Sequence, residues 1–212
     1  MQGEYSRRPI DLGLVRLRNM INDMSMVVGK VMKASMEFIE SGKIDMDGVR
    51  RMSDELLFMM EEVSELAVQL IARFQPVAID LREIKSAIQV SYDFSRIGRY
   101  AVNISETYPM MPKTGCNVKA LEEMFKIVLE MVNEAGEAYL GKDLEKAEEV
   151  KKRDDEVDAL YAEYIKQLIQ KGGEIDAGCL LSIALILRYL ERIADHACYI
   201  ADATIYMVKG RK

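Results

Sequence analysis

The chain has 212 residues, of which 50% are hydrophobic and 30% are charged, and its formal net charge is −6 at pH 7. This length and balance predict a globular protein with a sizeable buried core and argue against intrinsic disorder. Because the chain is acidic overall, it offers no large basic surface for a phosphate backbone, so we exclude nucleic acid as a partner and favour a cationic ligand.

The sequence predicts neither a membrane span nor a secretion signal. Its longest run of apolar or small residues, 177–187, is far shorter than the roughly 18 to 20 residues that a helix needs to cross a bilayer. Charged residues interrupt the apolar positions near the N-terminus, unlike those of a signal peptide. Cys116, Cys179 and Cys198 form no CxxC motif and cannot all pair, which suits a reducing compartment. We therefore expect a cytoplasmic protein.

The sequence predicts six long helices. Only 4 prolines and 13 glycines are present, which favours helices over many short strands. Between Leu14 and Val31, and again between Val118 and Tyr139, apolar residues recur every three or four positions, the spacing of a buried helix face. Such faces with short connections are typical of antiparallel bundles. The helices are separated by breaks at 41–43, 75–76, 109–115, 141–143 and 172–173.

The predicted helix boundaries carry capping residues. Three aspartates stand at expected N-caps and two glycines at expected helix ends, namely Asp45, Asp143, Asp176, Gly141 and Gly172. Residues 136–143 also match the GxxxxGK spacing of a phosphate-binding loop, but Asp143 replaces the hydroxyl residue and no strand precedes it. We interpret the segment as a helix end followed by a cap.

The chain also repeats itself. A shift of 96 residues aligns residues 94–101 with 190–197. Duplication of a three-helix unit is the simplest explanation of this pattern. We therefore predict an all-α fold of two tandem three-helix bundles with six long antiparallel helices. The first bundle is expected over residues 1–110 and the second over 116–212.

Two pairs of carboxylates in the second half suggest a functional site. Asp154 and Asp158 are four residues apart, and so are Glu191 and Asp195. Residues four apart on a helix are neighbours, so the like charges of each pair repel. Asp154 also occupies a position on the apolar face of its helix, where a buried carboxylate must be paired. Four such carboxylates facing each other would need a cation.

At these motifs the chain resembles the PhoU family of phosphate-uptake regulators. The family signature is a twice-occurring Leu-Glu-Arg-Ile-Gly-Asp-type motif late in each of two three-helix bundles, seen here at 190–197, with a partner motif at 153–161. The resemblance implies a metal site, with iron or zinc as the metal. Oxygen ligands alone are equally compatible with Mg, Mn or Ca. The implied metal ligands are Asp154, Asp158, Glu191 and Asp195.

The resemblance also implies partners. They would be the ATPase subunit of the phosphate ABC transporter and the membrane sensor histidine kinase of the phosphate response, with uptake and signalling repressed when phosphate is plentiful. We expect a regulatory adaptor rather than an enzyme, associated with the membrane through these partners. A homodimer is expected because the duplicated bundles are thin and elongated.

An ion-pair lattice on the helix surface is the alternative to a metal site. In that arrangement Glu191 and Asp195 would pair with Arg188 and Arg192. His196 projects about 100° away from Asp195 around the helix, so we expect a structural or outer-sphere histidine rather than a ligand.

Other polar residues near the acidic motifs receive structural interpretations. Asp155, Glu156 and Asp202 are expected to be solvated charges. Cys198 lies one turn past the late motif and could reach the site, but we favour a small buried core residue.

The first half departs from the acidic pattern. Under the same shift, Ser95 and Arg99 take the places of the two carboxylates of the late motif. Met60 and Ser64 replace those of the partner motif, so we predict one metal site per chain. Our hypothesis is that Arg99 supplies the positive charge instead and pairs with a carboxylate on the neighbouring helix, namely Glu61, Glu62 or Glu65.

Two other functions compete with the adaptor. A di-iron bundle enzyme needs Glu-x-x-His twice, and the single histidine is preceded at that spacing by Ile193, so that scheme fails. The second competing function is the regulation of another transporter, because PhoU-like bundles resemble domains attached to potassium-transport proteins. Methionines could also form a soft docking face for a partner, with Met24, Met26, Met59 and Met60 as the candidates.

Overall fold

The computed structural model describes residues 8–112 and 114–210. Within these ranges the chain forms six long helices, one short helix and one 3-10 turn, and it contains no strand. The predicted all-α fold is confirmed. The elements are α1 (Pro9–Met36), α2 (Phe38–Ser41), α3 (Met46–Phe74), α4 (Ala78–Thr107), η1 (Tyr108–Met110), α5 (Lys119–Gly141), α6 (Leu144–Gln170) and α7 (Ala177–Lys209).

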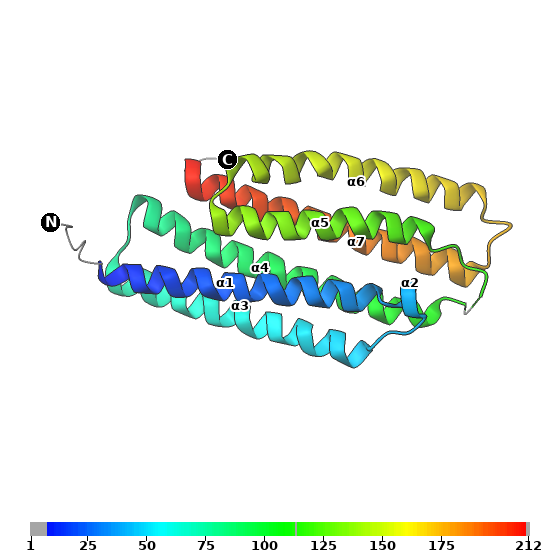
Figure 1. The fold of residues 1–212 in the computed structure, drawn as a ribbon, viewed down its shortest axis with the longest axis horizontal. Helices are drawn as coiled ribbons and strands as arrows, with labels where there is room; N and C mark the ends of the chain where they lie inside the picture. Colours follow the sequence, from blue (N-terminus) through cyan, green and yellow to red (C-terminus); the bar gives the residue numbers. More distant parts are fainter. Residues whose placement is uncertain (1–7, 113, 211–212) are drawn as a thin grey trace.

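The six long helices form two bundles of three. Helices α1, α3 and α4 pack against one another, as do α5, α6 and α7, and the two bundles lie side by side along their length (Figure 1). This arrangement confirms the prediction of tandem three-helix bundles. The short α2 and η1 follow the first and third long helices and were not predicted.

The buried faces are the ones that the apolar spacing predicts. Along α1, Leu17, Ile21 and Met24 are at most 1% exposed. Along α5, Val128 and Ala135 are fully buried. Burying an aliphatic side chain of this size stabilises the fold by about 1.5 to 3 kcal/mol, so these faces supply most of the driving force for bundle formation.

The three predicted N-caps are confirmed. The Asp45 carboxylate accepts a hydrogen bond from the Gly48 amide at 2.9 Å, and Asp143 accepts one from the Lys146 amide at 3.0 Å. At the start of α7, Asp176 accepts from the Gly178 amide at 2.8 Å. Each carboxylate thereby satisfies an amide that has no partner within the helix. Residues 136–143 are the end of α5 and the cap of α6, as interpreted from the sequence.

Helices α4 and α7 form the centre of the molecule. They pack against each other, and each also contacts both other helices of its own bundle. Phe94 on α4 and Ile193 on α7 are fully buried in a core that runs through both halves. On the neighbouring contact between α1 and α5, a Cβ atom on Gly136 would lie 2.6 Å from the Ser25 hydroxyl oxygen, so the absence of a side chain allows the close approach.

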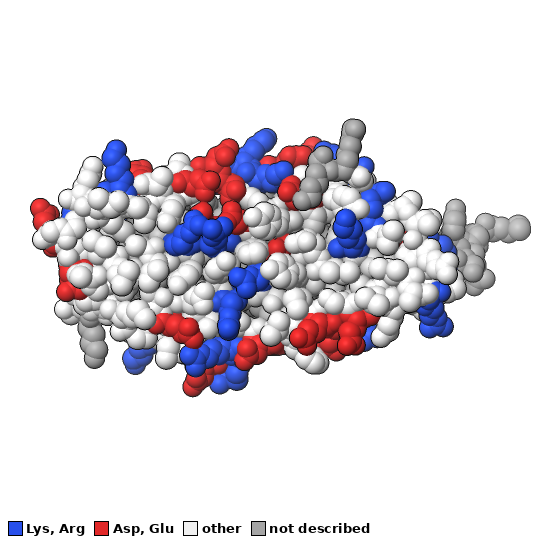
Figure 2. Space-filling model, turned by 180° about the vertical axis from the view of Figure 1, so that it is seen from behind, with Lys and Arg blue, Asp and Glu red and all other residues white. Residues whose placement is uncertain are grey.

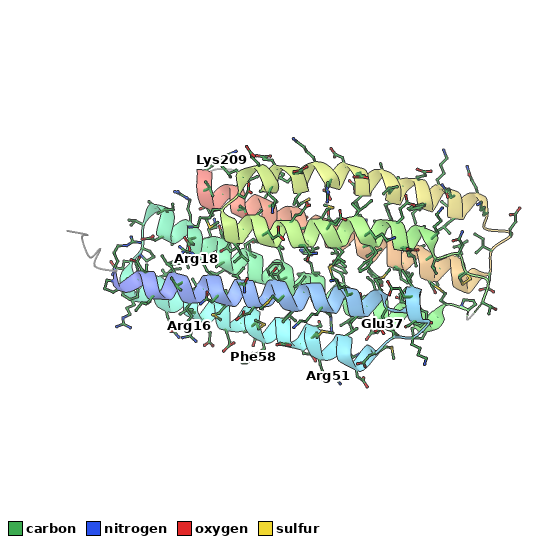
Figure 3. All side chains as sticks on the ribbon, viewed as in Figure 1. Arg16, Arg18, Glu37, Arg51, Phe58 and Lys209 are labelled. Atoms are coloured by element: carbon green, nitrogen blue, oxygen red, sulfur yellow. A yellow bond between two sulfur atoms is a disulfide. The ribbon has the colours of Figure 1, made fainter. Side chains whose placement is uncertain are left out.

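A buried ion cluster joins the two halves at one end of the bundles. The Glu83 side chain on α4 is only 5% exposed and accepts hydrogen bonds from Arg18 on α1 and, at 2.8 Å, from Lys142 after α5. Arg18 lies on the side of α1 that faces the second half, whereas Arg16 lies on the opposite side (Figure 3). Burial alone would raise the pKa of Glu83, but the hydrogen bonds and charges of the two cations outweigh it and lower that pKa.

Two of the three cysteines form a pair that the sequence analysis did not predict. Cys116 in the linker between the bundles and Cys179 in the first turn of α7 form a disulfide, with their Cα atoms 5.4 Å apart. Their sequence separation of 63 concealed the pair, because neither cysteine belongs to a short motif. Only Cys198 is a free, buried thiol. The cysteines therefore do not by themselves favour a reducing compartment.

The surface carries mixed charges. On the face seen in Figure 2, acidic and basic side chains lie interspersed among wide uncharged areas. The proposed methionine docking face does not form as one surface, because Met24 is fully buried whereas Met26 is 54% exposed. Met59 and Met60 are partly buried against the core.

The Glu83 cluster generates a pH-dependent prediction. Replacing Glu83 by Gln should lower the free energy of unfolding at pH 7 by about 1.5 to 3 kcal/mol, because hydrogen bonds to a charged group are lost. Since the pKa of Glu83 is lowered in the folded state, this stabilisation is present above its ordinary value of 4.5 and disappears as the pH falls through the lower folded value. Urea unfolding of both proteins across this pH range measures the difference.

The matched control is Glu106→Gln. Glu106 pairs with Arg50 at 2.7 Å, but both side chains are about half exposed, so the change should cost less than about 1 kcal/mol. A Glu83→Gln effect that is no larger than the control, or that persists unchanged into acid, would contradict the proposed role of the cluster.

Candidate metal site

The structure brings the four predicted carboxylates together where α6 packs on α7. Burial raises the pKa of Asp154, and the charges of Asp158 and Asp195 raise it further. Burial also raises the pKa of Glu191, and the charges of Asp195 and Asp158 act in the same direction, against Arg188 and Arg192. The two helices thus hold their carboxylates close enough for mutual repulsion.

The four carboxylates differ in their surroundings. Asp154, Glu191 and Asp195 are partly buried, whereas Asp158 is exposed. The Oε2 atom of Glu191 is buried and has no hydrogen-bond partner within the described residues. A buried carboxylate oxygen without a hydrogen-bond partner is costly, and the contact of this oxygen with Arg192 Nε, at 3.8 Å, is too long for a hydrogen bond.

Arginines neutralise the α7 pair. Arg188 Nη1 lies 2.6 Å from Glu191 Oε1, and Arg192 Nη1 lies 3.0 Å from Asp195 Oδ2. The ion-pair alternative considered from the sequence is therefore present on α7, although Glu191 is more buried than that alternative assumed. Over residues 8–112 and 114–210, no three Cys, His, Asp or Glu side chains already converge on one point at which a metal could sit.

The α6 pair is not neutralised in this way. Among the described side chains, no Lys, Arg or His nitrogen lies within 4.0 Å of the Asp154 or Asp158 carboxylate. Both guanidinium groups on α7 are well exposed, at 37% for Arg188 and 43% for Arg192, and can turn outward at little cost. The cluster therefore keeps negative charge that a bound cation could neutralise.

Cys198 adjoins this cluster from the core side. Its Sγ atom lies 3.9 Å from the Val150 carbonyl oxygen on α6, and the residue is 8% exposed. Burial raises the pKa of the Cys198 thiol, and the charge of Asp154 and a hydrogen bond to it raise the pKa further. The sequence interpretation as a small core residue is confirmed, with one side of the sulfur against the acidic cluster. Asp202 pairs with Lys151 at 2.7 Å rather than standing free in solvent.

His196 has a structural partner that the sequence interpretation missed. Its Nδ1 atom lies 2.9 Å from Oδ1 of Asp93 on α4, and Asp93 is fully buried. The other carboxylate oxygen of Asp93 accepts a hydrogen bond from Gln89 at 3.0 Å. His196 thus points toward the other bundle, away from the acidic cluster. The sequence signal for this pair was Asp93 itself, a single aspartate next to the apolar positions of α4.

The hypothesis for the first half is wrong. Arg99 is exposed and forms no ion pair within 4.0 Å of any carboxylate in the part of the chain that the structure describes. Glu61, Glu62 and Glu65 on α3 are exposed as well. Solvent stabilises such charges about as well as an exposed partner does, so no pairing is required.

The raised pKa values in the cluster generate a prediction about the metal-free protein. A carboxyl group whose pKa is raised by folding stabilises the protein below its ordinary value, 3.8 for Asp154, and this stabilisation is lost as the pH rises through the higher folded value. Replacing Asp154 by Asn should therefore increase the free energy of unfolding at pH 7, by about 0.5 kcal/mol for one relieved like-charge pair. Thermal unfolding in a chelator measures this gain, which should vanish in acid.

Asp155→Asn is the control, because Asp155 is exposed on the same helix. Its effect should be smaller, because the charge of Asp155 raises the pKa of Asp154 less than burial and the charges of Asp158 and Asp195 do. An Asp154→Asn protein that is less stable than the unmodified chain at pH 7 would contradict the inference that repulsion among the carboxylates destabilises the metal-free protein.

None of the helices in the described ranges combines the length and apolar character needed to cross a bilayer.

Comparisons with known proteins place the chain in a family. The model of the PhoU domain matches the chain twice, at residues 21–108 and 121–204. The phosphate-specific transport system accessory protein PhoU homolog of Clostridium acetobutylicum is 30% identical over 98% of this chain and 97% of its own length. PhoU homolog 1 of Methanothermobacter thermautotrophicus is 32% identical over 93% of this chain and 94% of its own length.

Solved structures agree with these sequence matches. The crystal structure of PhoU from Pseudomonas aeruginosa has a TM-score of 0.88 and 29% identity, covering 95% of this chain and 99% of its own. The regulatory protein PhoU from Streptococcus pneumoniae, at 20% identity and a TM-score of 0.78, supports the fold alone. With both halves matched by the family model and near full-length relatives at 30% identity or more, this chain belongs to the PhoU family.

Proposed function

We propose that this chain is an accessory regulator of a phosphate transport system. The observation that carries the proposal is the match of both halves to the PhoU domain, together with relatives that match almost end to end and are named as phosphate-specific transport accessory proteins. The proposed role is regulatory rather than catalytic, and the protein would act from the cytoplasmic side of the membrane.

The second element of the proposal is a metal bound by Asp154, Asp158, Glu191 and Asp195. Two features of the cluster support it: the buried Glu191 oxygen without a hydrogen-bond partner, and the α6 carboxylates without a neighbouring cation. A divalent or trivalent cation would contact all four groups at once and offset two or three of their four negative charges, whereas the two arginines on α7 contact only Glu191 and Asp195. Iron or zinc is favoured by resemblance to the family, and Mg, Mn and Ca are alternatives.

The metal would add chemistry that the side chains lack. When bound, it would offer a positive centre at the surface of the second bundle, to which an anion such as phosphate could bind. The chain's own contribution would be positional, because α6 packs along α7 and each helix carries one of the ligand pairs. Arg188 and Arg192 would turn toward solvent as the metal takes their place.

The metal proposal is tested on protein purified without a tag. Elemental analysis should find metal in the unmodified chain, whereas an Asp154→Asn, Asp195→Asn double variant should bind it at least tenfold more weakly, because half of the ligands are lost. Saturating metal at 100 times its dissociation constant should raise the free energy of unfolding of the unmodified chain by about 2.7 kcal/mol. Calorimetry or thermal unfolding measures that difference.

The matched control is an Asp155→Asn, Glu156→Gln double variant, which removes two exposed carboxylates from the same helix. It should retain the metal. Full metal content in the Asp154, Asp195 variant would move the site elsewhere and contradict the assignment.

The third element is docking on a membrane system. The proposed partners are the ATPase subunit of the phosphate ABC transporter and the sensor histidine kinase of the phosphate response, with the chain acting as a homodimer. The competing proposal is a PhoU-like regulator of a potassium transporter. Both rest on resemblance, so a direct comparison is needed.

Binding of the immobilised chain to purified cytosolic subunits separates these alternatives. The phosphate ATPase subunit should be retained, and the cytosolic subunit of a potassium transporter should not. Light scattering on the same sample should give twice the monomer mass. Retention of the potassium subunit alone would favour the competing function.

A further inference from the structure

A cleft lies at the end of the second bundle where α5 and α7 begin. Its volume is about 560 Å³, and its lining includes Gly115 and Asn117 of the inter-bundle linker, Glu123 of α5, Tyr164 of α6, and Asp176 and Ile183 at the start of α7. In Figure 1 this is the end at which α6 connects to α7. The linker forms one wall of the cleft, so the position of the linker determines how open the cleft is.

Two contacts hold the linker on α7. The first is the Cys116–Cys179 disulfide. The second is packing over Gly178, where an added Cβ atom would lie 3.1 Å from Pro112 Cδ and 3.2 Å from the Met110 carbonyl oxygen. The packing alone buries little side-chain surface, because it depends on a residue without a side chain. The disulfide is therefore the stronger of the two ties.

The two sulfurs differ in access and in chemistry. Cys179 is 1% exposed and lies in the first turn of α7, whereas Cys116 is partly exposed between two residues that line the cleft. A thiolate attacks a disulfide at the sulfur that it can reach, and the better leaving group is the thiolate that its surroundings stabilise. The amide groups at a helix N-terminus stabilise a thiolate, although the Asp176 carboxylate partly opposes this effect.

We propose that the Cys116–Cys179 disulfide is a reversible redox latch that closes the linker over the cleft. The thiolate of a small-molecule thiol attacks Cys116 Sγ, the S–S bond breaks, and the Cys179 thiolate leaves and takes up a proton. A second thiol attacks the mixed disulfide at the sulfur of the small molecule, releasing a low-molecular-weight disulfide and the Cys116 thiol. Two protein thiols form, and two small thiols are oxidised to one disulfide. The reverse reaction, with the low-molecular-weight disulfide as oxidant, closes the latch.

The latch would make the cleft respond to the thiol–disulfide balance around the protein. Disulfides that persist are rare in reducing compartments, where those present are usually redox-sensing or catalytic. Exposure is typical of exchangeable disulfides rather than of purely structural ones, and Cys116 is partly exposed. On reduction the linker loses its covalent tie to α7 and keeps the packing over Gly178 and the contacts of Met111 and Val118 with the core. The wall of the cleft between those two residues therefore loosens while both bundles stay folded.

The test uses the full chain purified without reductant and incubated in mixtures of reduced and oxidised glutathione. An alkylating reagent then marks free thiols, which are mapped by mass spectrometry. Cys116 and Cys179 should be unmodified at the start, should become modified together as reduced glutathione is added, and should be protected again by oxidised glutathione. Circular dichroism should remain unchanged throughout. Protease cleavage within residues 114–118 should become at least tenfold faster in the reduced protein.

Variants provide the matched controls. Cys116→Ser and Cys179→Ser should each show the fast linker cleavage without any reductant, whereas Cys198→Ser should respond to glutathione like the unmodified chain. Alkylation of Cys116 and Cys179 before any reductant is added would overturn the proposal. So would a disulfide that is reduced only when the protein unfolds, or a reduced protein whose linker is cleaved no faster. The glutathione experiment uses the unmodified chain. It therefore decides the proposal even if a serine variant folds poorly.

Discussion

The packing of α4 against α7 is the constraint on which the rest of this structure depends. Each bundle contributes its last helix, and the two helices bury a continuous apolar surface that belongs to neither half alone. The polar groups within this contact fix how the helices meet, because a fully buried Asp93 needs its partner His196 in place. A sliding of one helix along the other would leave one oxygen of that buried carboxylate without a partner, because Gln89 satisfies only the other. The apolar surface therefore supplies stability and the polar pair fixes the register.

The acidic cluster follows from the same arrangement. Helix α7 contacts α4 on one side and α6 on the other. Because successive residues of a helix point about 100° apart, adjacent residues of α7 can face different neighbours. Asp195 therefore meets the α6 carboxylates while His196, the next residue, meets α4. Because α7 is held on both sides, the protein cannot relieve the repulsion in the cluster by moving the helix. The carboxylates therefore still repel one another, because Arg188 and Arg192 pair only with those of α7. This repulsion would favour the binding of a cation.

Local features could be predicted from the sequence, and distant pairs could not. The capping aspartates and the buried faces were predicted because each depends on residues within a few turns of one helix. The Cys116–Cys179 disulfide spans 63 residues, and the Asp93–His196 pair spans 103. An apolar period tells which face of a helix is buried but not which helix covers it. The wrong pairing of Arg99 has the same origin, since placing two charges on neighbouring helices does not make them meet.

The Glu83 cluster has a consequence for the modular character of the chain. The carboxylate of the cluster belongs to the first repeat, and one of its cations, Lys142, belongs to the second. Lys142 has a left-handed backbone conformation, with φ at +54°, which most residues with a side chain avoid. The ancestral units have thus become mutually dependent. A fragment cut at the linker would carry either a Glu83 that keeps only Arg18 as its partner or a Lys142 that has lost Glu83. Each fragment would also expose a large apolar helix face, so neither repeat is expected to fold as a separate polypeptide.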